Sequence, residues 1–154
     1  MSAALGNWGM DNEAILLQVR DGELVGVGSW VYVWLRPSTD QPVIYVGSTG
    51  VPPVVRTWLH LHDDDPDVGR VVARYPDAAH EAMDVLAFSV PRHLSRSAVK
   101  AALIDLLDTR GLLSDRYAGD QPGLLTPDGG ASPTAEWMAD QVAAHSGPAR
   151  PDGR

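Results

Sequence analysis

The side chains best suited to chemistry are two tyrosines, an arginine and a histidine in the first half of the chain. Tyr32 and Tyr45 each lie in an apolar segment with the β-branched and aromatic composition that strands prefer. Arg56 and His60 are four residues apart in a predicted helix, so they share one helix face. Arginine can hold a phosphate through paired hydrogen bonds, and histidine can transfer a proton. Each residue also has a structural interpretation: the tyrosines pack across a hairpin, Arg56 is exposed and His60 is partly buried.

Other polar groups indicate a site less clearly. Four aspartates fall between positions 63 and 67, but calcium loops space their ligands further apart, so a solvated loop is the better interpretation. The absence of cysteine excludes disulfides, thiolate metal sites and cysteine nucleophiles. A zinc site is not expected either, because the remaining histidines show no ligand spacing with one another: His62, His80, His93 and His145.

The length and composition indicate one folded domain of ordinary size. The chain has 154 residues, of which 44% are apolar, and this argues against wholesale disorder. Its apolar runs are far shorter than the roughly 20 residues that a membrane span needs. The first residues show neither a basic segment nor an apolar one of the secretory type. We therefore expect a cytoplasmic protein with no membrane association.

The charge balance disfavours a nucleic-acid partner without excluding one. The formal net charge is -8 and the isoelectric point is near 4.9, whereas nucleic-acid binding usually draws on a basic face. An acidic chain still binds nucleic acid when its cations cluster on one face. Of the 12 cations only Lys100 is a lysine and the rest are arginines. That bias suits phosphate contacts or reflects a GC-rich genome, and the sequence leaves both explanations open.

The order of the predicted elements favours a small α/β (α+β) layer structure. Residues 30–35 and 43–47 are predicted strands joined by a short polar loop, which suggests an antiparallel hairpin. Residues 54–62 are a predicted helix, 68–73 a short helix, 84–90 a third strand and 95–107 an amphipathic helix. The expected fold is thus a small three-stranded, antiparallel-type sheet flanked by helices.

Extensions are expected on both sides of this core. Residues 1–28 form an N-terminal extension, in which Asp21-Gly22 is a turn signal between two short apolar stretches that together form an extra hairpin. Residues 29–117 form the main domain. Residues 118–154 comprise a flexible linker rich in glycine and proline, a short helix over 133–145 and a tail.

The residues at the ends of these elements resemble a known pattern. Val31-Tyr32-Val33 is followed, after 11 intervening residues, by Tyr45-Val46-Gly47. Arg56 comes nine residues after Gly47, and His60 one helical turn later. A final apolar helix carries Leu103-Ile104. Together these residues resemble the GIY-YIG nuclease family, and the resemblance covers a little over half of the chain.

The resemblance implies a role for each matched residue in phosphodiester cleavage. Tyr32 is the general base, although a free tyrosine has a pKa near 10 and needs a cation or metal-bound water beside it. Tyr45 orients water or substrate, and Arg56 holds the phosphate. His60 relays a proton or orients Tyr32. Gly47 is the structural glycine of the second triplet, and the family's cofactor is Mg²⁺ held by a glutamate.

The chain departs from the family at that glutamate. Lys100 stands three residues before the Leu-Ile pair, where the family has the metal ligand. The first glycine of the family triplet is Val31, and the asparagine often found beyond the last helix has no clear match. Lysine cannot ligate magnesium, which takes oxygen donors, so Mg²⁺ is implied by the resemblance but is not expected to be retained.

Three interpretations of Lys100 remain open. The enzyme is metal-independent or impaired, with the lysine partly replacing the charge of the metal. Alternatively, another carboxylate supplies the ligand: Asp105, Asp84 or Glu81. In the third interpretation catalysis is lost and the scaffold binds something.

The resulting expectation is a degenerate GIY-YIG-type endonuclease, a hydrolase acting on nucleic acid, with weakened or lost metal-dependent activity. The alternative is a non-catalytic protein- or ligand-binding module on a degenerate nuclease scaffold.

Overall fold

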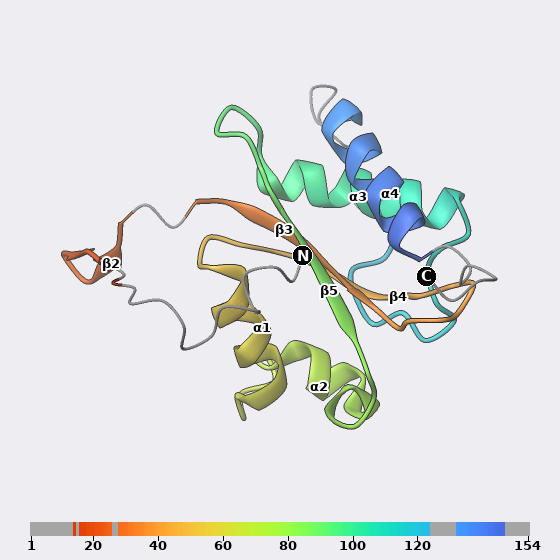
Figure 1. The fold of residues 1–154 in the computed structure, drawn as a ribbon, viewed down its shortest axis with the longest axis horizontal. Helices are drawn as coiled ribbons and strands as arrows, with labels where there is room; N and C mark the ends of the chain where they lie inside the picture. Colours follow the sequence, from red (N-terminus) through yellow and green to blue (C-terminus); the bar gives the residue numbers. More distant parts are fainter. Residues whose placement is uncertain (1–13, 15, 26–27, 124–131, 147–154) are drawn as a thin grey trace.

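The structure is a computed structural model that describes residues 14, 16–25, 28–123 and 132–146. A three-stranded antiparallel sheet lies between two layers of helices, with α3 and α4 on one face and α1 and α2 on the other (Figure 1). The mixed α+β fold expected from the sequence is therefore confirmed. Residues 1–13, 15 and 26–27 of the predicted N-terminal extension, residues 124–131 of the predicted linker and residues 147–154 of the predicted tail lie outside the described residues.

The sheet has the order β4-β3-β5, so the first predicted strand is its centre. β3 spans Trp30–Leu35, β4 spans Val43–Thr49 and β5 spans Asp84–Ser89. Both neighbours run antiparallel to β3, which pairs Tyr32 with Gly47 on one side and with Ala87 on the other. The predicted hairpin is therefore confirmed, and β4 extends two residues beyond its predicted end at Gly47.

A bulge in β4 decides which residues face which helices. The register between β3 and β4 shifts after the Trp34–Tyr45 pair, so that Leu35 pairs with Val43 and Ile44 is the extra residue. A bulge places two residues of one strand opposite one of its partner. Ile44 and Tyr45 consequently pack in the same cluster on the α1 and α2 side, while Val43 turns to the other face.

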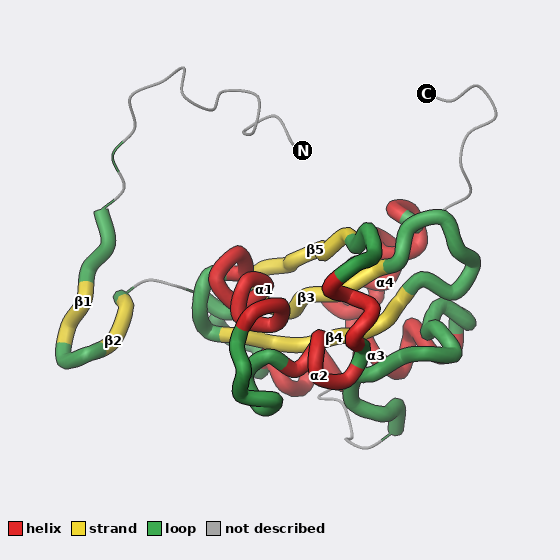
Figure 2. The backbone as a smooth tube through the Cα atoms, turned by 90° about the horizontal axis from the view of Figure 1, so that it is seen from below, coloured by secondary structure: helices red, strands yellow, loops and turns green. Residues whose placement is uncertain are grey.

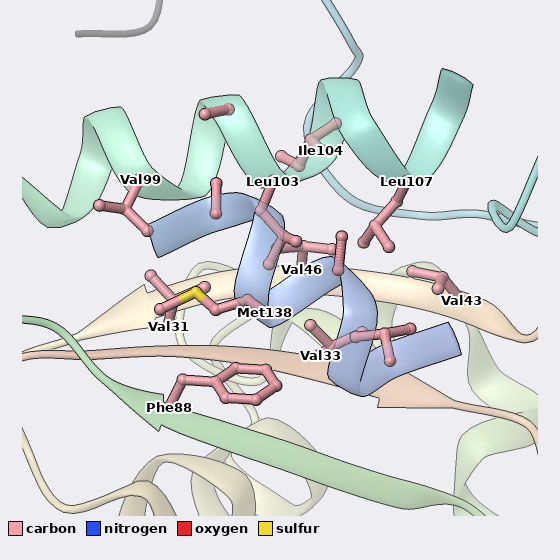
Figure 3. Packing of buried hydrophobic residues seen from close by; sticks show 14 of the residues in the cluster. Val31, Val33, Val43, Val46, Phe88, Val99, Leu103, Ile104, Leu107 and Met138 are labelled. Carbon is pink, nitrogen blue, oxygen red and sulfur yellow. The ribbon is translucent and has the colours of Figure 1, made fainter. Parts of the chain in front are cut away.

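The larger core lies between the sheet and helices α3 (Arg96–Thr109) and α4 (Ser132–His145). Valines of β3 and β4 point toward α3 and α4, and Leu103, Leu107 and Met138 fill the layer between them (Figure 3). Met138 and Val142 of α4 are fully buried, as is Leu103 of α3. The predicted helix at 133–145 is confirmed, and its apolar side belongs to the main core.

The second face of the sheet is covered by α1 (Pro53–His62), α2 (Arg70–Arg74) and the short 3₁₀ helix η2 (Pro76–Ala79). All three helices lie between β4 and β5 in the chain, so this single connection crosses the central strand. The cluster beneath it is more aromatic than the first: Tyr32, Trp34, Ile44, Tyr45, Val71, Tyr75 and Ala78.

The helix ends follow the signals in the sequence. Pro53 is the first residue of α1, where a missing N–H costs nothing. Ser95 caps α3 by accepting a hydrogen bond from the backbone N–H of Ala98 at 3.2 Å. Gly111, just beyond α3, has a φ of 72°, a left-handed conformation that glycine adopts without strain.

The segment after α3 covers the exposed edge of β4. Val43 donates its N–H to the carbonyl of Leu112 and accepts from Ser114, and Ala118 donates to Ile44 at 2.7 Å. An edge strand left open is a template for pairing with other chains. Residues 112–118 satisfy these groups instead. Ala118 packs against the aromatic cluster, whereas Tyr117 packs against the larger core.

A small hairpin precedes the main sheet, as predicted. β1 (Val19–Arg20) pairs with β2 (Glu23–Leu24), and Asp21 and Gly22 between them both have positive φ. The hairpin projects away from the rest of the molecule (Figure 2).

Two further features concern the surface. No helix in the described ranges has the length and apolarity needed to cross a bilayer. Trp34 is buried, whereas Trp58 is 59% exposed and lies against His62. Its position on the outer face of α1 explains the difference.

The burial of α4 gives a test of its place in the core. Met138→Ala should lower the free energy of unfolding by about 2–5 kcal/mol, because it leaves a cavity in a packed layer. Glu136→Ala, on the exposed side of the same helix, should change it by less than about 0.5 kcal/mol. Urea unfolding measures both. A Met138→Ala protein as stable as the wild type would show that α4 does not pack on the sheet.

Candidate functional site: a buried tyrosine–histidine pair ringed by arginines

The four residues singled out in the sequence come together on the aromatic face of the sheet. The hydroxyl of Tyr32 and Nε2 of His60 are 2.5 Å apart. The ring of Tyr45 lies 5.2 Å from that of His60 and 6.3 Å from that of Tyr32. Arg56 lies one turn before His60 on α1, and its guanidinium group lowers the pKa of Tyr32. Two strands and one helix therefore supply a single cluster.

The hydrogen bonds of His60 fix its tautomer. Nδ1 accepts from the backbone N–H of Val71 at 3.3 Å, and a backbone amide can only donate. In the neutral ring the proton must then sit on Nε2, so His60 donates to the oxygen of Tyr32. With both ring nitrogens engaged in this way, His60 orients Tyr32 and has no lone pair to accept the tyrosine proton.

His60 is held in its neutral form. It is fully buried. Burial, together with the positive charges of Arg56, Arg70 and Arg74, lowers the pKa of His60 to about 3. At neutral pH the ring is therefore an uncharged donor. The structure replaces the expected partly buried histidine by one enclosed by Tyr32, Tyr45 and Trp34.

Gly47 is required by the ring of Tyr32. The two residues are direct cross-strand partners, and the tyrosine ring lies flat across the glycine. A Cβ at position 47 would lie 2.5 Å from Cζ and 2.9 Å from Cε1 of Tyr32, far inside van der Waals contact. The two triplets of the sequence thus depend on each other through steric fit.

Tyr32 is a neutral phenol in this site. Burial and, to a smaller extent, Tyr45 raise the pKa of Tyr32, whereas the charges of Arg56 and Arg70 and a hydrogen bond from Arg56 lower it, and the resulting pKa is about 12. The burial effect is the larger one. A base in this position needs a lower pKa, so the cluster as it stands is better suited to hydrogen bonding than to proton abstraction.

A second arginine that the sequence analysis did not single out belongs to the cluster. Arg70 begins α2, hydrogen-bonds to Tyr45, which raises the pKa of Arg70, and donates from Nε to the carbonyl of Asp67 at 2.8 Å. Arg56 donates to the carbonyl of Val68 at 2.9 Å. Both guanidinium groups are thus anchored by neutral acceptors beside the two tyrosines.

Lys100, at the position where the resemblance predicts a glutamate, has a charged partner. Its Nζ forms an ion pair with Oδ2 of Asp120 at 2.8 Å, and Lys100 is the main reason that the pKa of Asp120 is lowered. The hydroxyl of Tyr117 donates to the main-chain carbonyl of Asp120 at 2.7 Å. Asp120 lies in the segment predicted as a linker, where no motif or spacing marked it.

The residues around Lys100 do not fit a magnesium ion, which takes several oxygen ligands. The one carboxylate paired there, Asp120, is neutralised by the lysine. The three carboxylates considered as substitutes all have other partners: Asp105 accepts from Gly123, Asp84 pairs with His145, and Glu81 pairs with Arg36 and Tyr75. Within the described ranges no three His, Cys, Asp or Glu side chains gather as metal ligands would.

A surface pocket lies elsewhere, between the β3–β4 loop and the end of α4. Its lining includes Arg36, Asp40, Asp84 and His145. None of the predicted site residues lines it. It lacks the buried polar pair and the converging cations found at Tyr32.

The depressed pKa of His60 predicts a pH-dependent stability. The unfolded chain takes up a proton near pH 6.5 and the native chain only near pH 3, so stability is full above pH 6.5 and falls as the pH drops through this window. The slope between pH 6 and 5, above the titration of most carboxylates, should reach up to about 1.4 kcal/mol per pH unit. His60→Gln should flatten it in urea unfolding at several pH values. An unchanged slope in this variant would assign the effect to another group.

The contact between Gly47 and Tyr32 predicts energetic coupling. Gly47→Ala should cost about 1–3 kcal/mol through overpacking, and most of that cost should vanish when Tyr32→Ala removes the ring. A double-mutant cycle followed by urea unfolding measures the coupling. Additive effects would show that the ring does not lie across the glycine.

Comparisons of the chain with protein-family models, with curated proteins and with solved structures each returned no match.

Proposed function

We propose that residues 29–117 form a GIY-YIG-type nuclease domain acting on nucleic-acid phosphodiesters, with metal-dependent cleavage weakened or lost. The observation that carries the proposal is the convergence of Tyr32, Tyr45, Arg56 and His60 on one face of the sheet. These residues were selected from motif spacing, and three separate elements bring them within hydrogen-bonding or ring contact. The steric dependence of Tyr32 on Gly47 adds support from the second triplet.

Two further observations support the loss of the metal-dependent step. Lys100 pairs with Asp120, so the expected glutamate position holds a neutral ion pair in place of a free carboxylate. Burial also raises the pKa of Tyr32 to about 12, which leaves the family's base protonated at neutral pH. Without a metal-bound water beside it, the phenol has little capacity to take a proton.

These same two observations favour a second candidate, a non-catalytic binding module on the same scaffold. The arginines beside Tyr32 and Tyr45 remain suited to holding an anion when catalysis is absent. The two candidates differ in turnover. Loss of affinity with rising salt would identify a nucleic-acid binder, whereas a protein-binding module should have no affinity for nucleic acid.

The proposal predicts a gain of metal binding when the ion pair is replaced. The wild type should bind no Mg²⁺ or Mn²⁺ in calorimetry and should cut mixed DNA and RNA no faster than Tyr32→Phe or Arg56→Ala. Lys100→Glu should bind metal, because it places a second carboxylate beside Asp120. Lys100→Gln, which removes the charge but adds no carboxylate, is the matched control and should bind none.

Two results would contradict this. Robust wild-type turnover that is lost in Tyr32→Phe or Arg56→Ala would make the chain an active nuclease. Metal binding by Lys100→Gln as strong as by Lys100→Glu would place the metal at another set of ligands.

A further inference from the structure

Three arginines and a lysine converge beside the aromatic cluster in a chain whose net charge is -8. Arg56 and Arg70 act on Tyr32, and Arg70 and Arg74 act together with Lys100 on Asp120. Hydrogen bonds place them near one another: Arg56 and Arg70 donate to the adjacent carbonyls of Val68 and Asp67. Arg74, one helical turn after Arg70, donates to the carbonyl of Ala118, two residues before the Asp120 that pairs with Lys100. These four cations therefore form one local positive region.

The arginines of this region donate hydrogen bonds to uncharged backbone carbonyls. Arg56 donates to the carbonyl of Val68, Arg70 to that of Asp67, and Arg74 to that of Ala118 at 3.1 Å. Among the described residues no carboxylate forms an ion pair with any of the three. Their charges remain available to an anion.

In the part of the chain that the structure describes, Asp120 is the one carboxylate that forms an ion pair with a cation of this region, and its side chain is half exposed. The Lys100 side chain is 18% exposed and that of Asp120 is 51% exposed. The main chain around Asp120 is anchored, because Tyr117 donates to its carbonyl and Gly123 donates to Asp105 at 2.7 Å. The carboxylate can therefore turn toward solvent while the backbone stays in place.

We propose that Asp120 is an internal counter-anion that occupies a phosphate site, and that a bound phosphate group displaces it from Lys100. Lys100, Arg70 and Arg74 form the site, with Arg56 at its Tyr32 side. A phosphate offers more acceptor oxygens and more charge than one carboxylate, and guanidinium groups match its geometry. One part of this inference rests on the proposed function: that the phosphate belongs to a nucleic-acid backbone and is not free phosphate.

Binding measurements on charge-matched variants test the displacement. The probes are inorganic phosphate and a short single-stranded oligonucleotide, titrated at fixed low salt into the full chain and followed by calorimetry. Asp120→Asn should bind phosphate about two- to fivefold more tightly than the wild type, the size expected when one partly exposed ion pair stops competing. Asp21→Asn, at the exposed turn of the β1–β2 hairpin, makes the same change in net charge and should have no effect.

A second pair of variants tests the cations themselves. Arg74→Gln should weaken phosphate binding, because it removes one charge of the site while the Lys100–Asp120 pair stays intact. Arg110→Gln is the control: Arg110 pairs with Asp140 at the far end of α3, so its loss should leave binding unchanged. Circular dichroism of each variant confirms that the fold is retained.

The outcomes separate this inference from the proposed function. Tighter phosphate binding by Asp120→Asn with no oligonucleotide binding would support the site and remove nucleic acid as its source. Equal effects of Asp120→Asn and Asp21→Asn on both probes would overturn the inference, since net charge alone would explain them, and would leave the proposed function standing. Absence of phosphate binding in every variant would also overturn it.

Discussion

The hydrogen bond between Tyr32 and His60 joins the central strand to α1, and most of the site depends on it. Burying an imidazole is costly unless both ring nitrogens have partners. Tyr32 satisfies one nitrogen and the backbone N–H of Val71, the second residue of α2, satisfies the other. The same pair of bonds thus fixes the position of α1, of α2 and of the phenol. Gly47 completes the arrangement, because only a residue without a side chain leaves room for the ring.

The charge around this site is positive, whereas the net charge of the whole chain is negative. The protein is strongly acidic, yet Arg56, Arg70 and Arg74 all act on His60. Burial and the arginines both keep the histidine neutral, whereas for Tyr32 burial outweighs the arginines and keeps the phenol protonated. The cluster is consequently rich in donors, and donors are what an anionic ligand requires. This local character, and not the net charge, supports an anion as the ligand.

Much of the architecture was predictable because the elements carry strong local signals. Strands β3 and β4 are dense in β-branched and aromatic residues, α3 has an amphipathic pattern, and Ser95 and Gly111 mark its ends. The site was predictable only where it coincided with a motif, as for Tyr32, Tyr45, Arg56 and His60. Arg70, Tyr117 and Asp120 were missed, because nothing in their spacing sets them apart from surface residues.

The sequence by itself determined the order and type of the elements and placed two tyrosines on adjacent strands, since periodicity and residue preference act over a few neighbouring positions. Only the tertiary structure decided that Tyr32 lies across Gly47, that His60 is a buried neutral donor, and that Lys100 is paired with Asp120. Each of these depends on groups 11 to 28 residues apart in the chain, which come together through packing of the sheet, α1, α2, α3 and the segment covering β4. Burial and charge proximity are properties of that packing, so the protonation states of the site arise only in the folded protein.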